Sequence, residues 1–219
     1  QGYSAGVGDE GGFAPNLKED SEAIEMILAA VEMAGYKCPD DFMISLDVAA
    51  SEWVQGDSYV MPKRNVKFST GELIKNWVNL CARYPIFSIE DPLGENDWNG
   101  WQKLTGDLEA VGIYGIIGDD LFVTNSERLR KGIKMKAGNG ILIKPNQIGT
   151  VTETVDTIRF ARANGFKTIV SHRSGETEDT FIADLAVGMN TGFIKTGAAC
   201  RGERVAKFNR LLRIEEMLD

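Results

Sequence analysis

Three acidic residues, Asp47, Glu90 and Asp119, each come directly after a short apolar run of the sequence. The run at 86–89 before Glu90 is an example, and Pro92 stops it soon afterwards. Carboxylates held close together repel one another unless a cation neutralises them, and a ligand set made only of oxygen atoms suits Mg²⁺. Any one of these acids alone would more often be a solvated residue at a strand end. Three of them after consecutive runs predict a magnesium site.

Two further acids, Asp91 and Asp120, immediately follow Glu90 and Asp119. Neighbouring residues of a strand point to opposite faces, so these two acids are not expected to bind the ion themselves. They are expected to support the residues that do.

Three more reactive side chains end other short runs: Glu10, Lys144 and Lys195. A lysine that is partly desolvated beside a bound dication has a lowered pKa and can act as a base at neutral pH. A lysine whose stem lies along the rim of the fold is an equally good interpretation of either lysine alone. If Glu10 faces Lys144 across a metal, the pair can remove a proton on one side of a substrate and expel a group on the other.

The only histidine of the chain, His172, is followed by Arg173 and Ser174. A single histidine is usually a hydrogen-bonded structural residue, but a guanidinium fork beside a hydroxyl group suits a phosphate. The Gly-rich turn at 8–12 is a phosphate cradle or a plain turn, since it lacks the Gly-Lys-Ser/Thr element and carries two acids. A Ser-His-Asp hydrolase is disfavoured, because no nucleophile elbow is present.

Helical patterns alternate with the apolar runs, which predicts an α/β fold with a parallel sheet, because parallel strands need helical crossovers. Nearly every run ends in a chemically active residue. This favours a TIM-type (β/α)₈ barrel over a doubly wound sheet, whose ligand groups collect at one switch point. The runs recur about every 31 residues, as in a barrel of eight units in ~250 residues. Helices are predicted at 21–34, 69–84, 97 onward, 125–136, 150 onward, 177 onward and 202–218, and a polar excursion with a turn at Gly56 and Asp57 reaches Asn65. Local signals mark several of the helix ends: a cap by Asp20 or Ser21 and an end at Gly35 for the first helix, a cap by Asp97, and the capping boxes Ser69–Glu72 and Thr150–Glu153.

About seven strands can be counted in the chain, the first of them a Gly-rich stretch before Glu10. A closed barrel needs eight, so the first barrel strand is expected to precede Gln1. Residues 1–219 are therefore expected to form the C-terminal barrel domain of a longer protein. With 43% hydrophobic residues, the chain can bury one sizeable core.

The formal net charge of −8 and the pI near 4.9 argue against nucleic acid or an anionic membrane as a partner, since both need clustered Lys and Arg. No apolar run approaches the roughly 18 residues of a membrane span, and no signal peptide is visible. Cys38, Cys81 and Cys200 lie far apart without metal-ligand spacing, which favours reduced thiols in a cytoplasmic protein.

Five stretches of the sequence carry a family resemblance. They are GDEGGFAPN at 8–16, SIEDP at 88–92, GDDL at 118–121, NQIGT at 146–150 and SHRSGETED at 171–179. Together they cover essentially the whole chain in order, and the stretch at 171–179 is the most specific. The chain thus resembles enolase, phosphopyruvate hydratase, in its bacterial form.

The resemblance implies reversible dehydration of 2-phospho-D-glycerate to phosphoenolpyruvate in glycolysis. Mg²⁺ would be bound by Asp47, Glu90 and Asp119; the complete enzyme uses two Mg²⁺ per active site, of which residues of this chain would mainly hold one. Lys144 would remove the proton α to the carboxylate, and Glu10 would assist loss of the C3 hydroxyl. A Lys base combined with one or two Mg²⁺ ions is a known solution for stabilising an ene-diolate in this superfamily.

The resemblance also assigns the residues that hold the substrate. Lys195 would neutralise carboxylate charge, Arg173 and Ser174 would hold the phosphate, and His172 would close over the substrate beside Lys144. Such enzymes form homodimers or higher homo-oligomers. They are cytoplasmic, and are also found at the cell surface or secreted without a signal peptide.

The family carries an N-terminal α+β domain, which would precede Gln1. That region supplies the partner of Glu10, mobile lid loops and a serine for the second Mg²⁺, so the chain alone is expected to be catalytically deficient.

Two features depart from the family pattern. Pro145 stands where valine is frequent and lacks a backbone N–H beside Lys144, and the loop 198–202 is looser than usual.

Two other functions remain open. A different barrel enzyme could abstract α-protons with the same metal triad, although the motif around Glu10 disfavours it. Enolases also capture plasminogen at cell surfaces through lysine-rich segments. Residues 53–60 and the end at Asp219 contain no lysine, which disfavours that role.

Overall fold

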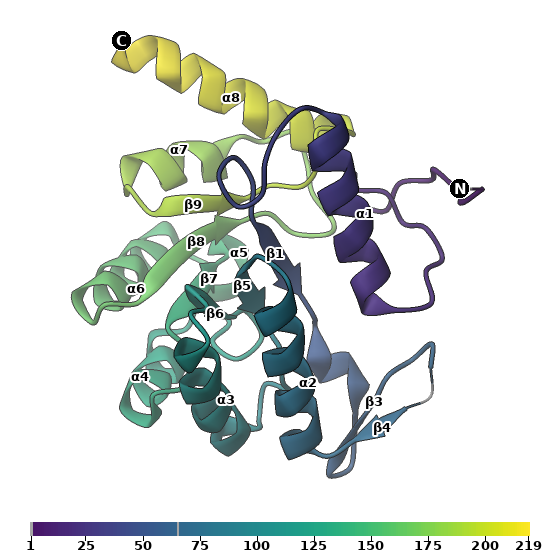
Figure 1. The fold of residues 1–219 in the computed structure, drawn as a ribbon. Coiled ribbons are helices and arrows are strands. Elements are labelled where there is room, and N and C mark those ends of the chain that lie inside the picture. The colour runs from purple at the N-terminus through teal and green to yellow at the C-terminus, as the bar shows by residue number, and fades with distance from the viewer. Residues whose placement is uncertain (1, 65) are drawn as a thin grey trace. The chain divides into compact units, whose positions relative to one another are not determined.

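The computed structural model describes residues 2–64 and 66–219 (Figure 1). The chain divides into two compact units. Unit 1 consists of residues 2–16, 123–126 and 141–219, and unit 2 of residues 17–122 and 127–140. Gln1 and Asn65, where the predicted first strand begins and the predicted excursion ends, lie outside the described residues.

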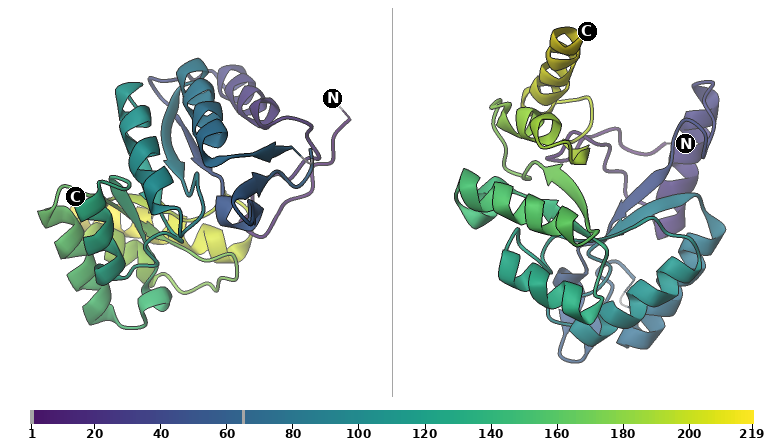
Figure 2. Two further views of the ribbon diagram at one scale, coloured as in Figure 1. Left: turned by 90° about the horizontal axis from the view of Figure 1, so that it is seen from below. Right: turned by 90° about the vertical axis from the view of Figure 1, so that its left-hand side faces the viewer.

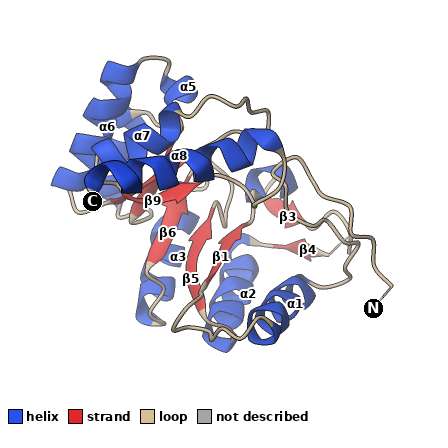
Figure 3. Ribbon diagram, turned by 90° about the horizontal axis from the view of Figure 1, so that it is seen from above, coloured by secondary structure: helices blue, strands red, loops and turns tan. Residues whose placement is uncertain are grey.

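Unit 2 is built on three parallel strands in the order β1 (Ile44–Asp47), β5 (Ile86–Glu90) and β6 (Gly115–Gly118). Strands β1 and β5 lie side by side in Figure 3. Strands β5 and β6 are buried almost throughout, as expected of parallel strands with apolar residues on both faces. Helices α2 (Thr70–Arg83) and α3 (Trp98–Ala110) separate the strands along the chain, which confirms the predicted α/β class with helical crossovers.

The predicted starts of α2 and α3 are confirmed by their caps. Ser69 and Glu72 form a capping box, in which the Glu72 carboxylate accepts a 2.8 Å hydrogen bond from the Ser69 backbone N–H. Asp97 accepts a 3.0 Å hydrogen bond from the Gly100 N–H at the start of α3. Both caps satisfy backbone donors that a helix start would otherwise leave unpaired.

Helix α1 (Asp20–Met33) ends before Gly35, which has a φ of +84° and closes the helix as predicted. The predicted cap by Asp20 or Ser21 is wrong. The capping position is occupied by Glu19, which makes no side-chain cap bond, and the chain is held instead by a 3.1 Å hydrogen bond from the Lys18 N–H to the Glu22 carboxylate. Helix α4 (Ser126–Met135) matches its predicted range closely.

A small antiparallel sheet interrupts unit 2 between β1 and α2. Its strands are β2 (Val54–Gln55), β3 (Ser58–Val60) and β4 (Lys67–Phe68), and they follow the short 3₁₀ helix η1 (Ala50–Trp53). The turn between β2 and β3 falls at Gly56 and Asp57, as predicted.

Unit 1 contains three more parallel strands, in the order β7 (Gly140–Ile143), β8 (Lys167–Ser171) and β9 (Gly192–Lys195). Ser171 and Lys195 are register partners at the ends of β8 and β9. Its helices are α5 (Pro145–Ile148), α6 (Val151–Ala163), α7 (Phe181–Gly188) and α8 (Gly202–Leu218), the last of which runs to the C-terminus (Figure 2). Across the described part of the chain, the structure contains no helix long and apolar enough to cross a membrane.

The stretch before Glu10 is not the strand that the sequence predicts. Val7 makes only an isolated antiparallel bridge to Phe13. The intervening turn is closed by hydrogen bonds from Gly8 N to Gly12 O at 2.9 Å and from Gly11 N to Gly8 O at 3.0 Å. The Gly-rich turn therefore folds back on itself, and this engages the backbone N–H groups of Gly8 and Gly11.

The helix predicted from Thr177 begins four residues later, at Phe181. The Thr177 hydroxyl accepts a hydrogen bond from the Asp179 N–H, and the Asp179 carboxylate accepts a 2.8 Å bond from the Phe181 N–H. These side-chain bonds offer the backbone an alternative to a helical turn. At the start of α6, the Thr150 hydroxyl accepts from the Glu153 N–H at 3.2 Å, as predicted, and donates to the Glu153 carboxylate at 2.6 Å.

Candidate active site

The three predicted metal ligands all lie at the C-terminal ends of parallel strands in unit 2. Asp47 and Glu90 are register partners, and Glu90 pairs on its other side with Ile117, two residues before Asp119. Laterally paired residues of a parallel sheet point to the same face, and so do residues two apart. The backbone therefore places Asp47 and Glu90 on one face, and Asp119 directly follows the end of the neighbouring strand β6. Glu90 and Asp119 are each only 7% exposed, whereas Asp47 is exposed to solvent.

Asp91 links the ends of β5 and β6. Its carboxylate accepts hydrogen bonds from the Asp119 N–H at 3.0 Å and the Asp120 N–H at 2.8 Å. The pKa of Asp91 is raised to about 7, mainly by burial; the negative charges of Asp119 and Asp120 contribute to the rise, and the two N–H donors oppose it. By its contacts, Asp91 fixes the backbone that carries Asp119.

The carboxylates of Asp91, Asp119 and Asp120 lie within 4.8 Å of one another and form a group that could hold a metal ion. The group is made only of oxygen donors, and two of its members are buried. Buried carboxylates are costly unless a cation or hydrogen-bond donors compensate them, and hard dications such as Mg²⁺ prefer oxygen ligands. The acids at the ends of β5 and β6 therefore fit a magnesium ion.

In unit 1, the turn at 8–12 brings Glu10 to the loop that follows β8. A Glu10 carboxylate oxygen, Oε2, lies 3.2 Å from His172 Nε2, and the Ser174 hydroxyl donates a 3.4 Å hydrogen bond to the other oxygen, Oε1. The His172 contact is at ion-pair distance, but its angles fall outside hydrogen-bond geometry, and both ring nitrogens of this buried residue lack a hydrogen-bond partner among the described residues.

The surroundings of Glu10 favour its ionised form. Contact with His172 is the largest cause and lowers the pKa of Glu10 to about 2; burial opposes the shift, and the positive charges of Lys195 and Arg204 add to it. Glu10 is therefore a carboxylate at neutral pH, although its side chain is still 43% exposed and open to solvent.

The two residues expected to hold phosphate follow His172 directly. The Arg173 guanidinium donates a 3.2 Å hydrogen bond to the side-chain oxygen of Asn146, and the Arg173 N–H bonds to the Glu176 carboxylate. Arg173 is half-buried, and Ser174 is exposed. The Asn146 contact orients the guanidinium, and its remaining N–H groups can meet an anion.

The two predicted lysines end strands β7 and β9. Lys195 is half-buried, and its carbonyl accepts a 2.9 Å hydrogen bond from the His172 N–H. Lys144, also half-buried, precedes α5, whose first helical position is Pro145. The first N–H groups of a helix have no partner within the helix, so a proline at this position costs no hydrogen bond. Pro145 is therefore compatible with the helix that begins beside Lys144.

Thr124 is a residue that sequence reasoning missed. It is fully buried, and its hydroxyl accepts a 2.9 Å hydrogen bond from the Lys144 N–H and contacts the Gln147 side-chain oxygen at 2.8 Å. Its φ of +56° is unusual for a residue with a branched side chain. A lone threonine between a strand and a helix gives no sequence signal for this role. It nevertheless fixes the backbone that carries Lys144.

Arg204 was also missed. Its side chain is completely buried near the start of α8, and its guanidinium donates to three backbone carbonyls of unit 1. Within a helix rich in charged residues, nothing in the local sequence distinguishes this arginine from its exposed neighbours.

Comparison of the sequence with known proteins identifies relatives of this chain. A sequence model described as the C-terminal TIM barrel domain of enolase matches residues 1–219. An enolase of Natranaerobius thermophilus is 53% identical over 218 residues, which is all of this chain and 51% of that protein. The chain thus spans about half the length of the curated relative that it matches.

Proposed function

The chain belongs to the enolase family, whose C-terminal TIM barrel domain it matches throughout, and from this premise we propose that it carries the catalytic residues of a phosphopyruvate hydratase. The reaction would be the reversible, Mg²⁺-dependent dehydration of 2-phospho-D-glycerate to phosphoenolpyruvate in glycolysis. The observation that carries the proposal is the contact of Glu10 with His172 and Ser174, which brings together, in unit 1, an acid, a histidine and the loop that we propose to bind phosphate.

We propose Asp47, Glu90 and Asp119 as the ligands of one Mg²⁺ ion. Their places at the C-terminal ends of three neighbouring parallel strands support this set, and the hydrogen bonds from the Asp119 and Asp120 N–H groups to Asp91 support a positioning role for Asp91. When bound, the ion supplies positive charge next to the substrate carboxylate, where negative charge develops as the α-proton leaves. A second ion, as the family uses, would need further ligands.

Lys144 is proposed to take the α-proton. A proton α to a carboxylate is very weakly acidic, so its removal needs a base held in place and positive charge that stabilises the resulting dianion. Lys144 is half-buried at a strand end, and its backbone is fixed by the buried Thr124, which suits the first need. Lys195, beside the His172 backbone, is proposed to serve the second.

Glu10 is proposed to act on the C3 oxygen. Because its pKa lies near 2, Glu10 starts as a carboxylate, which can accept a proton from water in the hydration direction. In the dehydration direction, a proton must reach Glu10 before it can leave with the hydroxyl. The contact with His172 Nε2 offers a neighbouring group that can hold such a proton.

The phosphate is proposed to bind Arg173 and Ser174, and His172 to close over the substrate. Arg173 is oriented by Asn146, and the Ser174 hydroxyl is exposed. For the protein as a whole, a cytoplasmic location and assembly as a homodimer or higher homo-oligomer are likewise proposed from the family. Capture of plasminogen is not proposed, since residues 53–60 offer no lysine.

The test is Mg²⁺-dependent formation of phosphoenolpyruvate from 2-phosphoglycerate, followed by ultraviolet absorbance. We expect little turnover from the 219-residue chain alone, and full turnover when the chain is joined to the preceding half of a close relative. Absence of turnover in the joined protein, with Mg²⁺ bound and the fold intact, would refute the proposed function. Turnover by the chain alone would support the reaction but show that its own residues suffice.

A further inference from the structure

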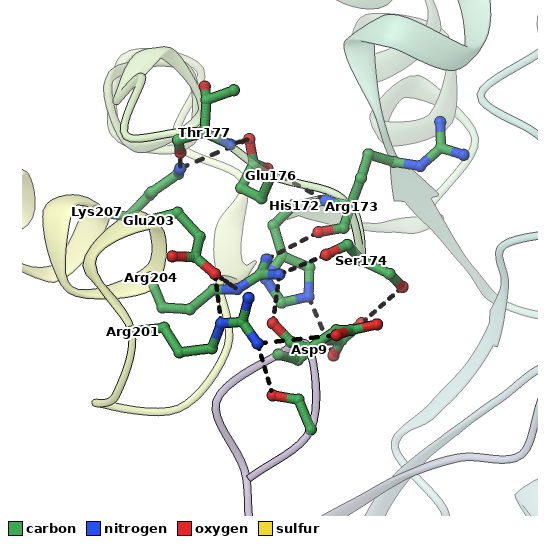
Figure 4. A network of polar contacts seen from close by, with 12 residues as sticks. Asp9, His172, Arg173, Ser174, Glu176, Thr177, Arg201, Glu203, Arg204 and Lys207 are labelled. Atoms are coloured by element: carbon green, nitrogen blue, oxygen red, sulfur yellow. Dashed lines mark hydrogen bonds and ion pairs between the residues drawn. The ribbon is translucent and has the colours of Figure 1, made fainter.

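Arg204 ties together two segments of unit 1 that are far apart in the sequence. Its Nη2 donates hydrogen bonds to the carbonyls of Asp9 at 2.8 Å and Ser174 at 2.7 Å, and its Nη1 donates to the carbonyl of Arg173 at 2.8 Å. Figure 4 shows the guanidinium between the turn that carries Asp9 and the loop that follows β8. No part of the Arg204 side chain reaches solvent.

These two segments carry the side chains that meet at the proposed site. Glu10 follows Asp9, and the loop after β8 carries His172 and Ser174, whose contacts with Glu10 measure 3.2 and 3.4 Å. The two segments are separated by 164 residues of sequence. Contacts of this length depend on where the backbone of each segment lies, and Arg204 bonds to both backbones.

The packing around Arg204 leaves little freedom. A Cβ atom on Gly197 would lie 2.6 Å from Arg204 Cδ and 2.7 Å from the Glu10 carbonyl oxygen, so only glycine fits between them. Gly197 also has a φ of +84°, which side chains rarely adopt. The next residue, Ala198, donates its N–H to the Glu10 carbonyl at 2.9 Å. Gly197 therefore packs between the Arg204 stem and the Glu10 carbonyl, with no room for a larger residue.

The chemistry of the guanidinium suits this task. Arginine presents five N–H donors in a rigid planar fork, so one side chain can bind several carbonyls in fixed directions, whereas a lysine ammonium is a single point donor. A buried cation would be costly without such bonds. Glu203 lies near the Arg204 guanidinium, with one carboxylate oxygen 3.8 Å from Arg204 Nε.

We propose that Arg204 is a positioning residue, which sets the distance between Glu10 and the His172–Ser174 loop by binding the backbones of both. Its effect on turnover rests on the function proposed above, but its effect on the contact between Glu10 and His172 does not.

Lys207 provides a matched control. It lies three residues further along α8 and is equally buried. Its ammonium donates to the Thr177 carbonyl and lies 3.6 Å from the Glu176 carboxylate. Both described partners belong to the loop after β8 and neither to the turn at 8–12. Lys207→Met thus removes a buried cation from the same helix without removing the link to Asp9.

The direct readout is the ionisation of Glu10, measured as the pH dependence of its carboxyl ¹³C resonance in glutamate-labelled protein and assigned with Glu10→Gln. The protein used includes whatever upstream part its gene encodes. The charged groups that face Glu10 are His172, Lys195 and Arg204. We compare Arg204→Met, the charge-preserving Arg204→Lys, and Lys207→Met.

In the wild type and in Lys207→Met, Glu10 is expected to stay ionised down to about pH 3. In Arg204→Met and Arg204→Lys, the titration midpoint is expected to rise by at least about one pH unit, because the His172 contact is lost. A rise in the Met variant alone would show that Arg204 acts only through its charge and would overturn the proposal. An equal rise in Lys207→Met would overturn it as well. If Arg204→Met does not fold, Arg204→Lys decides.

Turnover gives a second readout. Since a displacement of about 1 Å can cost about 100-fold in rate, kcat is expected to fall by that order in Arg204→Lys and by much less in Lys207→Met. If the wild-type protein shows no turnover, the proposed function fails, and the Glu10 titration still decides the role of Arg204.

Discussion

The ionisation of Glu10 couples the proposed site to stability. The pKa of Glu10 is lowered, mainly by His172, from an ordinary value near 4.5 to about 2 in the folded chain. A carboxyl group with a lowered folded-state pKa stabilises the fold above its unfolded pKa, and this contribution is lost as the pH falls through the folded pKa. The window for Glu10 therefore runs from about pH 4.5 down to about pH 2.

Glu10→Gln is accordingly expected to reduce the free energy of unfolding at pH 6, but not near pH 2. Because the side chain is 43% exposed, solvent screens the interaction, and we expect a loss of only about 0.5–1 kcal/mol. Denaturant unfolding at both pH values measures the difference. A loss of the same size at pH 2 would mean that packing, and not charge, holds this residue.

Asp91 holds the backbone of Asp119 and Asp120 at the end of β6 in place. Asp91→Ala would leave the buried N–H of Asp119 and that of Asp120 without their acceptor, at about 1–3 kcal/mol each. We expect Asp91→Ala to lower the free energy of unfolding by about 2–4 kcal/mol and to weaken Mg²⁺ binding at least about tenfold.

Asp91→Asn is the control for this prediction, since its side chain keeps one carbonyl acceptor of the same size. It is expected to lose roughly half as much stability. Calorimetric titration with Mg²⁺ and denaturant unfolding measure the two effects. Equal stability of the Ala variant and the wild type would show that water replaces the carboxylate.

At the scale of elements, the connection between β6 and α4 matters because it carries Thr124, whose hydroxyl holds the Lys144 N–H just before α5. Thr124→Val keeps the shape of the side chain but removes the acceptor for the Lys144 N–H. We expect a loss of about 1–3 kcal/mol in stability, and a larger drop in kcat than in Mg²⁺ affinity. Thr124→Ser, which keeps the hydroxyl, should restore most of kcat. Equal kcat in the Val and Ser variants would mean that this hydrogen bond does not position Lys144.

Elements were predictable from the sequence where local chemistry decides their ends. Ser69 with Glu72, Asp97 before α3 and Gly35 after α1 are signals within a few residues of the helix ends that they set. The parallel class followed from the alternation of runs and helices. The strand expected before Glu10 failed, because Gly8 and Gly11 close the turn on itself, and a Gly-rich stretch has no side-chain pattern that separates a strand from such a turn.

Candidate residues were predictable where they end strands, since a strand end is visible in the sequence. Thr124 and Arg204 were not, because their roles depend on partners such as Lys144 and Asp9, from which sequence spacing gives no distance. Burial of a charged side chain in α8 is likewise decided by its partners and not by its neighbours in sequence.

At the scale of the whole molecule, the proposed functions are divided between the two units. Asp47, Glu90 and Asp119 belong to unit 2, whereas Glu10 and Lys144 belong to unit 1. If metal binding is the task of unit 2 and proton transfer that of unit 1, substitutions in the two units must affect different measurements.

Glu90→Gln is therefore expected to weaken Mg²⁺ binding by at least about tenfold, because it removes one anionic oxygen ligand from a buried position. Lys144→Ala, in the chain joined to the preceding half of a close relative, is expected to lower kcat by at least about 10³-fold, since proton abstraction loses its base, while Mg²⁺ affinity stays within about threefold. Calorimetry and turnover are measured on both variants. Turnover like that of the wild type in Lys144→Ala would remove Lys144 as the base, and an unchanged Mg²⁺ titration in Glu90→Gln would remove Glu90 from the metal site. If instead Lys144→Ala weakened Mg²⁺ binding as much as Glu90→Gln, the division of tasks between the units would be wrong.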